Sequence, residues 1–88
     1  MTDDEKLTRI RAILADPFGV YPDLDEKERK VARLASRGHT LEEVGVALGI
    51  SPNTAGSIVK RITLKTGLTK TAMTTAVFKM LEKVLAAK

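Results

Sequence analysis

Between Thr40 and Pro52 the chain carries three helix-boundary signals in close succession. Thr40 and Glu43 have the spacing of a capping box, in which two side chains satisfy free amides at a helix start. Gly49 then ends this short helix, and Ser51-Pro52 opens the next one with a capping hydroxyl and a proline that needs no amide partner. Two helices joined by so short a turn cross steeply. The sequence therefore predicts a helix-turn-helix whose second helix projects outward.

Apolar spacing and capping residues predict three more helices around this motif. The expected helices span about residues 3–15, 25–37, 40–48, 52–66 and 69–87. Pro17 must end the first of them, and we expect Phe18, Val20 and Tyr21 in the following connector to fold back onto the core. No strand signal or internal repeat is present. The predicted fold is all-α: an N-terminal helix and connector over residues 1–23, then a four-helix domain over residues 24–88 with an extended C-terminal helix.

Charge is distributed unevenly along the chain. Residues 1–28 carry four basic and eight acidic side chains, a net −4, whereas residues 29–88 carry eleven basic and three acidic side chains, a net +8. The excess of positive charge therefore belongs to the part that holds the helix-turn-helix. Such a distribution favours a polyanionic partner, although a lysine-rich solvated helix surface gives similar counts.

Several function classes are disfavoured by composition. The chain has no cysteine and one histidine, His39, which we expect to be an exposed loop residue, so we predict neither a metal site nor any other cofactor. We find no nucleophile paired with a base and no phosphate-binding glycine loop, and we predict that the chain is not an enzyme. The acidic N-terminus is unlike a signal peptide, and no apolar run approaches the ~18 residues of a membrane span. A cytoplasmic location is therefore expected.

A set of residues in one register resembles a known family over about three-fifths of the chain. The matching positions are Leu24, Glu28, Val31, Leu34, Ala35 and Gly38, then Thr40, Glu43, Val44 and Leu48, then Ile50, Ser51 and Thr54, and finally Ile62, Lys65 and Leu68. From Leu24 to about Val77 the sequence resembles the LuxR/GerE-type DNA-binding domain of bacterial transcription regulators. The resemblance implies a transcription regulator whose recognition helix, about residues 52–66, enters the major groove of double-stranded DNA.

The same resemblance implies roles for particular side chains. Asn53 and Thr54 would contact backbone phosphate, Ser57 and Lys60 would face the bases, and Arg61 and Lys65 would hold flanking phosphates. These assignments suit the chemistry, because lysine can donate to guanine O6 and N7 while cations neutralise phosphate. The full set of predicted DNA-binding residues is Thr40, Ser51, Asn53, Thr54, Gly56, Ser57, Lys60, Arg61 and Lys65.

The last predicted helix carries apolar residues around more than one narrow stripe. In the family that the chain resembles, this helix forms the dimer contact. We therefore expect a homodimer through the C-terminal helix, with Met73, Val77, Met80, Leu81 and Val84 at the interface. The alternative is that the N-terminal helix covers this surface within the same chain.

The predicted recognition helix departs from the family pattern at four positions, one of which is Thr66 in place of a customary leucine. Ala55, Gly56 and Ile58 stand where the family usually has valine, lysine and histidine, and the change at Gly56 removes a cation from the groove-facing surface. A glycine inside a helix costs up to ~1 kcal/mol relative to alanine, which suggests that another molecule approaches closely there. A second hypothesis follows: a protein-interaction module similar to region 4 of sigma factors, with a protein partner docked at Gly56 and Ile58.

Overall fold

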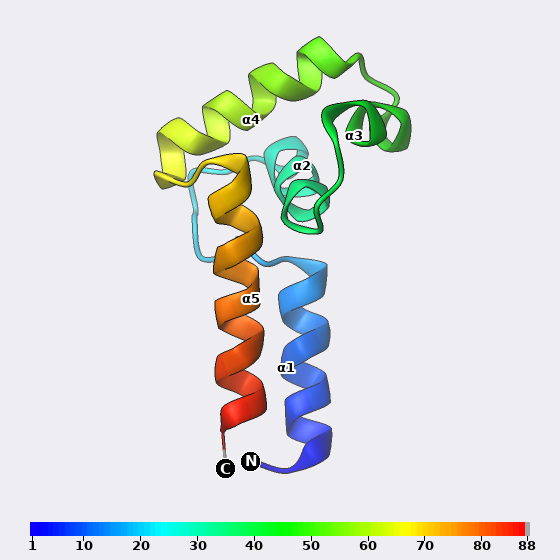
Figure 1. Cartoon of the computed structure of the whole chain (residues 1–88). Helices are drawn as coiled ribbons and strands as arrows, with labels where there is room; N and C mark the ends of the chain where they lie inside the picture. The colour runs from blue at the N-terminus through cyan, green and yellow to red at the C-terminus, as the bar shows by residue number, and fades with distance from the viewer. Residues whose placement is uncertain (88) are drawn as a thin grey trace.

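Residues 1–87 are described by a computed structural model, in which they form five helices and no strand (Figure 1). The helices are α1 (Asp3–Ala15), α2 (Glu26–Ser36), α3 (Leu41–Leu48), α4 (Pro52–Thr66) and α5 (Lys70–Ala86). The predicted all-α class is confirmed, and each predicted boundary falls within about two residues of the observed one.

Helix starts and ends follow the local signals in the sequence. A side-chain oxygen of the residue just before each helix accepts a hydrogen bond from a first-turn amide, and these caps are Thr2, Asp25, Thr40, Ser51 and Thr69. The predicted capping box of Thr40 with Glu43 forms in full, and so does one of Asp25 with Glu28. Gly49 and Gly67 end α3 and α4 with φ of 68° and 75°, a left-handed conformation that residues with a Cβ rarely adopt.

The core lies where α2 meets α3, α4 and α5. Its buried residues are Phe18, Leu24, Val31, Ala32, Ala35, Val44, Ala55, Ile58, Ile62, Met73 and Val77. Phe18 folds back onto this core as expected, and Tyr21 packs against it. The prediction for Val20 is wrong, because its side chain is 77% exposed.

The helices divide between two ends of an elongated molecule. In Figure 1, α1 and α5 run antiparallel side by side, and both chain termini lie at the far end of this pair. At the opposite end α4 lies across the top of α5, with α3 beside it. Arg37, which follows the end of α2, and Arg33 of α2 hold the last turn of α1, since their guanidinium groups donate to the carbonyl oxygens of Leu14 (2.8 Å) and Ala15 (3.4 Å).

The predicted dimer interface on the last helix needs correction. Met73, Val77 and Val84 are 0%, 6% and 7% exposed within the single chain, so they are not available to a second one. Met80 and Leu81 are half-buried. The physical reason is that α5 has two neighbours in its own chain, α2 and α1, which cover different parts of its apolar circumference. The alternative, in which the N-terminal helix covers this surface, holds only in part, because α1 packs beside α5 but α2 covers it as well.

No helix within residues 1–87 combines the length and the apolar character that crossing a bilayer requires.

Candidate nucleic-acid interface

The turn between α3 and α4 depends on a glycine that sequence analysis missed. A Cβ on Gly45 would lie 2.5 Å from the backbone oxygen of Ile50, closer than real side chains approach. The backbone amide of Ile50 donates to the carbonyl oxygen of Gly45 at 2.9 Å, which fixes the turn against the middle of α3. The signal was present, because a glycine inside an eight-residue helix is unfavourable unless something packs against its backbone.

This turn holds α4 with one side on the core and the other in solvent. Ala55, Ile58 and Ile62 form the inner side and are at most 1% exposed. On the opposite side, the exposed residues Asn53, Thr54, Ser57, Lys60 and Arg61 recur at spacings of three and four, which places them along one stripe of the helix. We call this set the outer face of α4. It contains five of the six residues predicted to contact bases or phosphates, all except Lys65.

Local hydrogen bonds already engage several hydroxyls of the predicted DNA-binding set. Ser51 Oγ accepts from the amide of Thr54 at 3.1 Å and donates to Thr54 Oγ1 at 2.9 Å. Ser57 Oγ donates to the carbonyl oxygen of Asn53 at 3.1 Å. Thr40 lies at the start of α3, outside the outer face of α4, where its hydroxyl accepts from the amide of Glu43 at 3.2 Å. The structure therefore gives Ser51 and Thr40 a capping role.

Lys65, which was predicted to hold a flanking phosphate, is paired with an acid of its own chain. Its ammonium donates to Glu28 Oε1 at 2.8 Å and to the carbonyl oxygen of Asp23 at 2.9 Å. The side chain of Glu28 is fully buried, whereas that of Lys65 is 37% exposed. The lysine charge is thus largely compensated by a carboxylate that water cannot reach. This pair joins the last turn of α4 to the first turn of α2.

The predicted protein-docking surface around Gly56 and Ile58 is also wrong. Ile58 is 1% exposed and faces the core together with Ala55, because a spacing of three brings both onto one side of the helix. A Cβ on Gly56 would meet only Leu41 Cδ1, at 3.4 Å, which is an ordinary van der Waals contact. The neighbour of this glycine therefore comes from the same chain.

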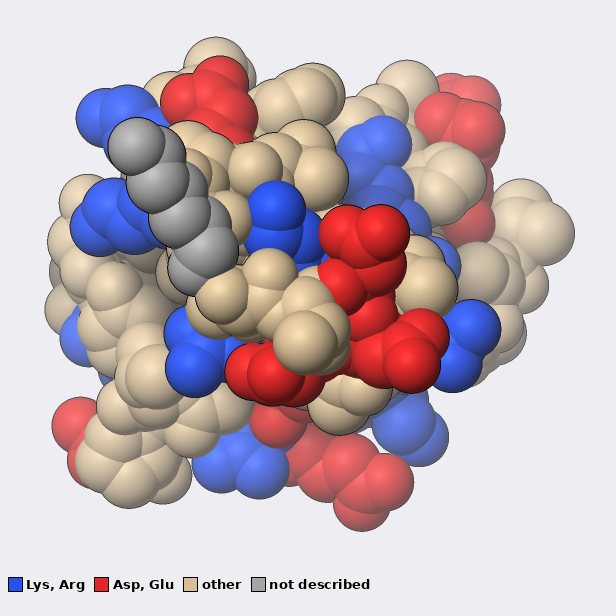
Figure 2. Space-filling model, turned by 90° about the horizontal axis from the view of Figure 1, so that it is seen from below, with Lys and Arg blue, Asp and Glu red and all other residues tan. Residues whose placement is uncertain are grey.

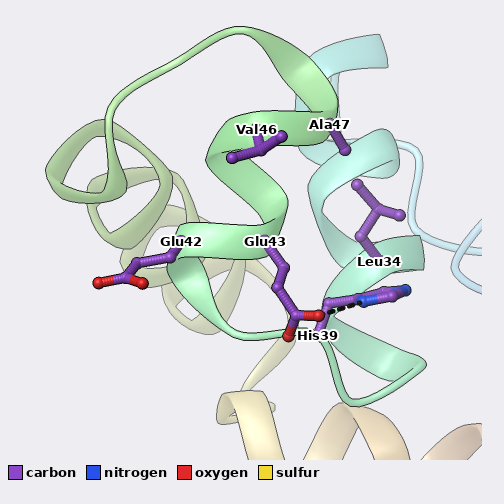
Figure 3. Close-up of a pocket in the computed structure, with 6 residues that line it drawn as sticks. All are labelled: Leu34, His39, Glu42, Glu43, Val46 and Ala47. Atoms are coloured by element: carbon purple, nitrogen blue, oxygen red, sulfur yellow. Dashed lines mark ion pairs between the residues drawn. The ribbon is translucent and has the colours of Figure 1, made fainter.

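A separate shallow hollow lies between α2 and α3 (Figure 3). Its apolar lining comes from Leu34, Val46 and Ala47, and Figure 3 shows the His39 ring facing the Glu43 carboxylate at its edge. His39 Nδ1 lies 3.6 Å from Glu43 Oε2, so the expected exposed loop histidine is in fact half-buried and paired with a neighbour. Among residues 1–87 no cluster of three or more His, Cys, Asp or Glu side chains could hold a metal ion.

The two capping carboxylates are expected to make the fold less stable in acid. The backbone amide of Glu28 lowers the pKa of Asp25, and the backbone amide of Thr40 is the main cause of the lowered pKa of Glu43. A carboxyl group whose pKa is lower in the folded state stabilises the fold above its unfolded pKa, about 4, and loses this effect as the pH falls through the folded value. We expect the melting temperature to drop below about pH 4.

Thermal unfolding followed by circular dichroism between pH 7 and pH 3 measures this effect. The control is the double variant Asp25→Asn, Glu43→Gln, which keeps side-chain acceptors at both caps but removes their titration. Its melting temperature should change less over the same range. An equal change in the variant and the wild type would show that other carboxyl groups are responsible.

Comparison of the chain with protein-family models, with curated proteins and with solved structures gave no match. The assignment of function therefore depends on the geometry and chemistry of α3, α4 and the turn between them.

Proposed function

We propose that this chain is a sequence-specific regulator of transcription that inserts α4 into the major groove of double-stranded DNA. The observation that supports this proposal best is the position of α4, which lies across one end of the molecule with its outer face in solvent (Figure 1). An α-helix fits the major groove, where each base pair presents a distinct pattern of donors and acceptors. The resemblance to the LuxR/GerE-type domain supports the same reading.

The outer face of α4 has the groups that such binding requires. Ser57 and Lys60 lie near the middle of the helix, where side chains reach base edges, and lysine suits guanine O6 and N7. Asn53 precedes these two residues along α4 and Arg61 follows them, and both side chains can donate to phosphate oxygens. Because Lys65 is paired with Glu28, the cations of this face are Lys60 and Arg61. We therefore expect a modest electrostatic contribution for each chain.

The size of this electrostatic contribution can be estimated from how DNA affinity depends on salt concentration. Each phosphate neutralised on duplex DNA contributes about −0.9 to the slope of log affinity against log salt concentration. Two cations on α4 should give a slope of about −2 per chain, and Lys60→Ala or Arg61→Ala should each reduce its magnitude by about 1. The measurement is a fluorescence-anisotropy titration at several salt concentrations, using a sequence first selected from random duplex DNA.

Lys79→Ala on α5 is the matched control, because it removes the same charge from an exposed position away from α4. It should leave the slope unchanged. Failure to enrich any duplex sequence in the selection, or equal effects of Lys60→Ala and Lys79→Ala, would contradict the proposal.

A further inference from the structure

Leu64 is an exposed leucine near the end of α4. Its side chain is 86% exposed, and among residues 52–66, all of which the structure describes, it is the only large apolar side chain left in solvent. Ile58 and Ile62 of the same helix face the core, and Val59 is half-buried. Single exposed leucines are common on protein surfaces, so the role of this one depends on where it lies.

The position of Leu64 is on the continuation of the outer face of α4. Ser57 precedes it by seven residues, and a step of seven returns to nearly the same side of an α-helix, with a drift of only about 20°. Lys60 and Arg61 precede it by four and three residues, which makes them its neighbours on the helix surface. Leu64 therefore extends the predicted base-contacting stripe by two turns beyond Ser57, near the middle of that stripe.

The last turn of α4 offers this apolar group without a free cation beside it. Within residues 63–66, which are all described, Lys65 is the one charged residue, and its ammonium donates to Glu28 Oε1 at 2.8 Å. This turn is thus poorly equipped to hold a phosphate. If α4 meets DNA, the group that Leu64 presents to it is a hydrocarbon surface, which gains most from contact with another apolar group.

The opposite end of the molecule is less suited to DNA than the end that carries α4. Figure 2, which views the end with both termini, shows acidic groups gathered beside basic ones. The first turn of α1 contributes Asp3, Asp4 and Glu5 to that end. Residues 51–66, in contrast, contain no acidic side chain. Repulsion of phosphate by carboxylates therefore favours the approach of DNA to the end where Leu64 is exposed.

We infer that Leu64 packs against the 5-methyl group of a thymine in the major groove and so sets the preferred base at one position of the DNA site. The inference rests on the proposed function. Thymine is the one base of DNA that presents a methyl group in this groove. A purine would place N7, with guanine O6 or adenine N6, against the leucine, where these groups lose water without gaining a partner. Cytosine lacks the methyl group.

The geometry of α4 also predicts where this thymine lies. The helix lies lengthwise across its end of the molecule, so its outer face can follow the groove rather than meet it end-on (Figure 1). Four residues separate Lys60 from Leu64, which is about 6 Å along the helix axis. Successive base pairs of DNA are about 3.4 Å apart. We therefore expect the thymine about two base pairs from the base that Lys60 contacts.

Replacing thymine by deoxyuridine tests the inference, because it removes only the 5-methyl group and keeps every hydrogen-bonding group. The probe is a duplex first selected from random DNA with the full chain, then remade with deoxyuridine at each thymine in turn. At the predicted position, the wild type should bind about fourfold more weakly, the value for one buried methyl group. The same replacement should have no effect on the affinity of Leu64→Ala.

Leu64→Ala should itself bind the thymine duplex at least about fourfold more weakly than the wild type. The slope of log affinity against log salt concentration should stay unchanged, because no charge is removed. Val46→Ala on α3 is the matched control, since Val46 is also 86% exposed but lies away from α4. It should keep both the wild-type affinity and the deoxyuridine effect. Both variants replace exposed side chains, and circular dichroism would show that the fold persists.

Two results would overturn the inference and leave the proposed function standing. One is a selected duplex that the wild type binds equally well with deoxyuridine at every thymine. The other is a loss on deoxyuridine replacement that Leu64→Ala shows in full. Failure to enrich any duplex sequence is a different result, because it removes the proposed function and the inference together.

Discussion

Replacing Lys65 by methionine is expected to lower the free energy of unfolding by about 3 kcal/mol, the lower end of the range for breaking a buried ion pair. The loss comes from the partner that remains. Glu28 is fully buried, and without the ammonium its Oε1 keeps only the bond from the Asp25 amide at 2.9 Å. Its Oε2 already has no hydrogen-bond partner. For a domain of this size, such a loss lowers the melting temperature by roughly 12–24 °C.

Two further variants separate this explanation from a general effect of removing a lysine. Lys60→Met makes the same chemical change at an exposed position of the same helix and should leave stability within about 0.5 kcal/mol of the wild type. In Glu28→Gln, Lys65→Met the buried group is neutral, so part of the loss should return. If Lys65→Met were as stable as Lys60→Met, the ion pair would contribute nothing measurable and Lys65 would again be free to contact phosphate.

The same two lysines should differ in the opposite sense when DNA binding is measured. At a temperature where both variants are folded, Lys60→Met should weaken binding and reduce the salt slope, because Lys60 lies on the outer face of α4. Lys65→Met should keep the wild-type slope, because its charge is compensated by Glu28 before DNA arrives. Of these two lysines of α4, Lys65 would thus contribute to stability and Lys60 to DNA recognition.

The helices could be predicted from the sequence because their boundaries depend on neighbouring residues. Asp25 with Glu28, and Thr40 with Glu43, act over three positions, and Gly49 acts on its own backbone. Capping signals of this kind involve only residues within a few positions of one another, so they do not depend on the tertiary structure. The buried residues of α4, Ala55, Ile58 and Ile62, also recur at helical spacing, and this spacing speaks against the docking surface that was expected at Ile58.

Features that involve residues far apart in the sequence could not be predicted in this way. Glu28 completes the capping box of Asp25, and nothing local indicated that Lys65, at a distance of 37 positions, would neutralise it. Apolar residues surround much of α5, so periodicity could not decide which of them meet α1 or α2 and which stay exposed. The structure buries Met73 and Val77, which were expected at a dimer interface, and leaves Phe78 in solvent.

Gly45→Ala is expected to destabilise the chain by about 2 kcal/mol and to disturb the angle between α3 and α4. The added methyl group would lie 2.5 Å from the Ile50 carbonyl oxygen, 3.5 Å from the Pro52 nitrogen and equally close to the carbonyl carbon of Ser51. These are backbone atoms, so no side-chain rotation relieves the overlap. Overpacking of this kind costs up to about 3 kcal/mol, offset by about 1 kcal/mol from the better helix propensity of alanine.

Gly56→Ala is the matched control, because it makes the same substitution inside the next helix. There the methyl group would meet only Leu41 Cδ1, at 3.4 Å, and the gain in helix propensity should stabilise the chain by up to ~1 kcal/mol. Urea unfolding of the two variants should therefore change stability in opposite directions. Equal stabilities would mean that the turn can shift away from Gly45 at little cost.

DNA binding by the folded fraction of Gly45→Ala decides what the close contact is for. Relief of the overlap must move Ile50 and the turn away from α3, which displaces the start of α4 relative to the rest of the molecule. Recognition of base edges depends on where that start lies, so a small displacement should weaken sequence-specific binding more than binding to random DNA. If the folded variant bound its selected sequence as tightly as the wild type, Gly45 would serve stability alone.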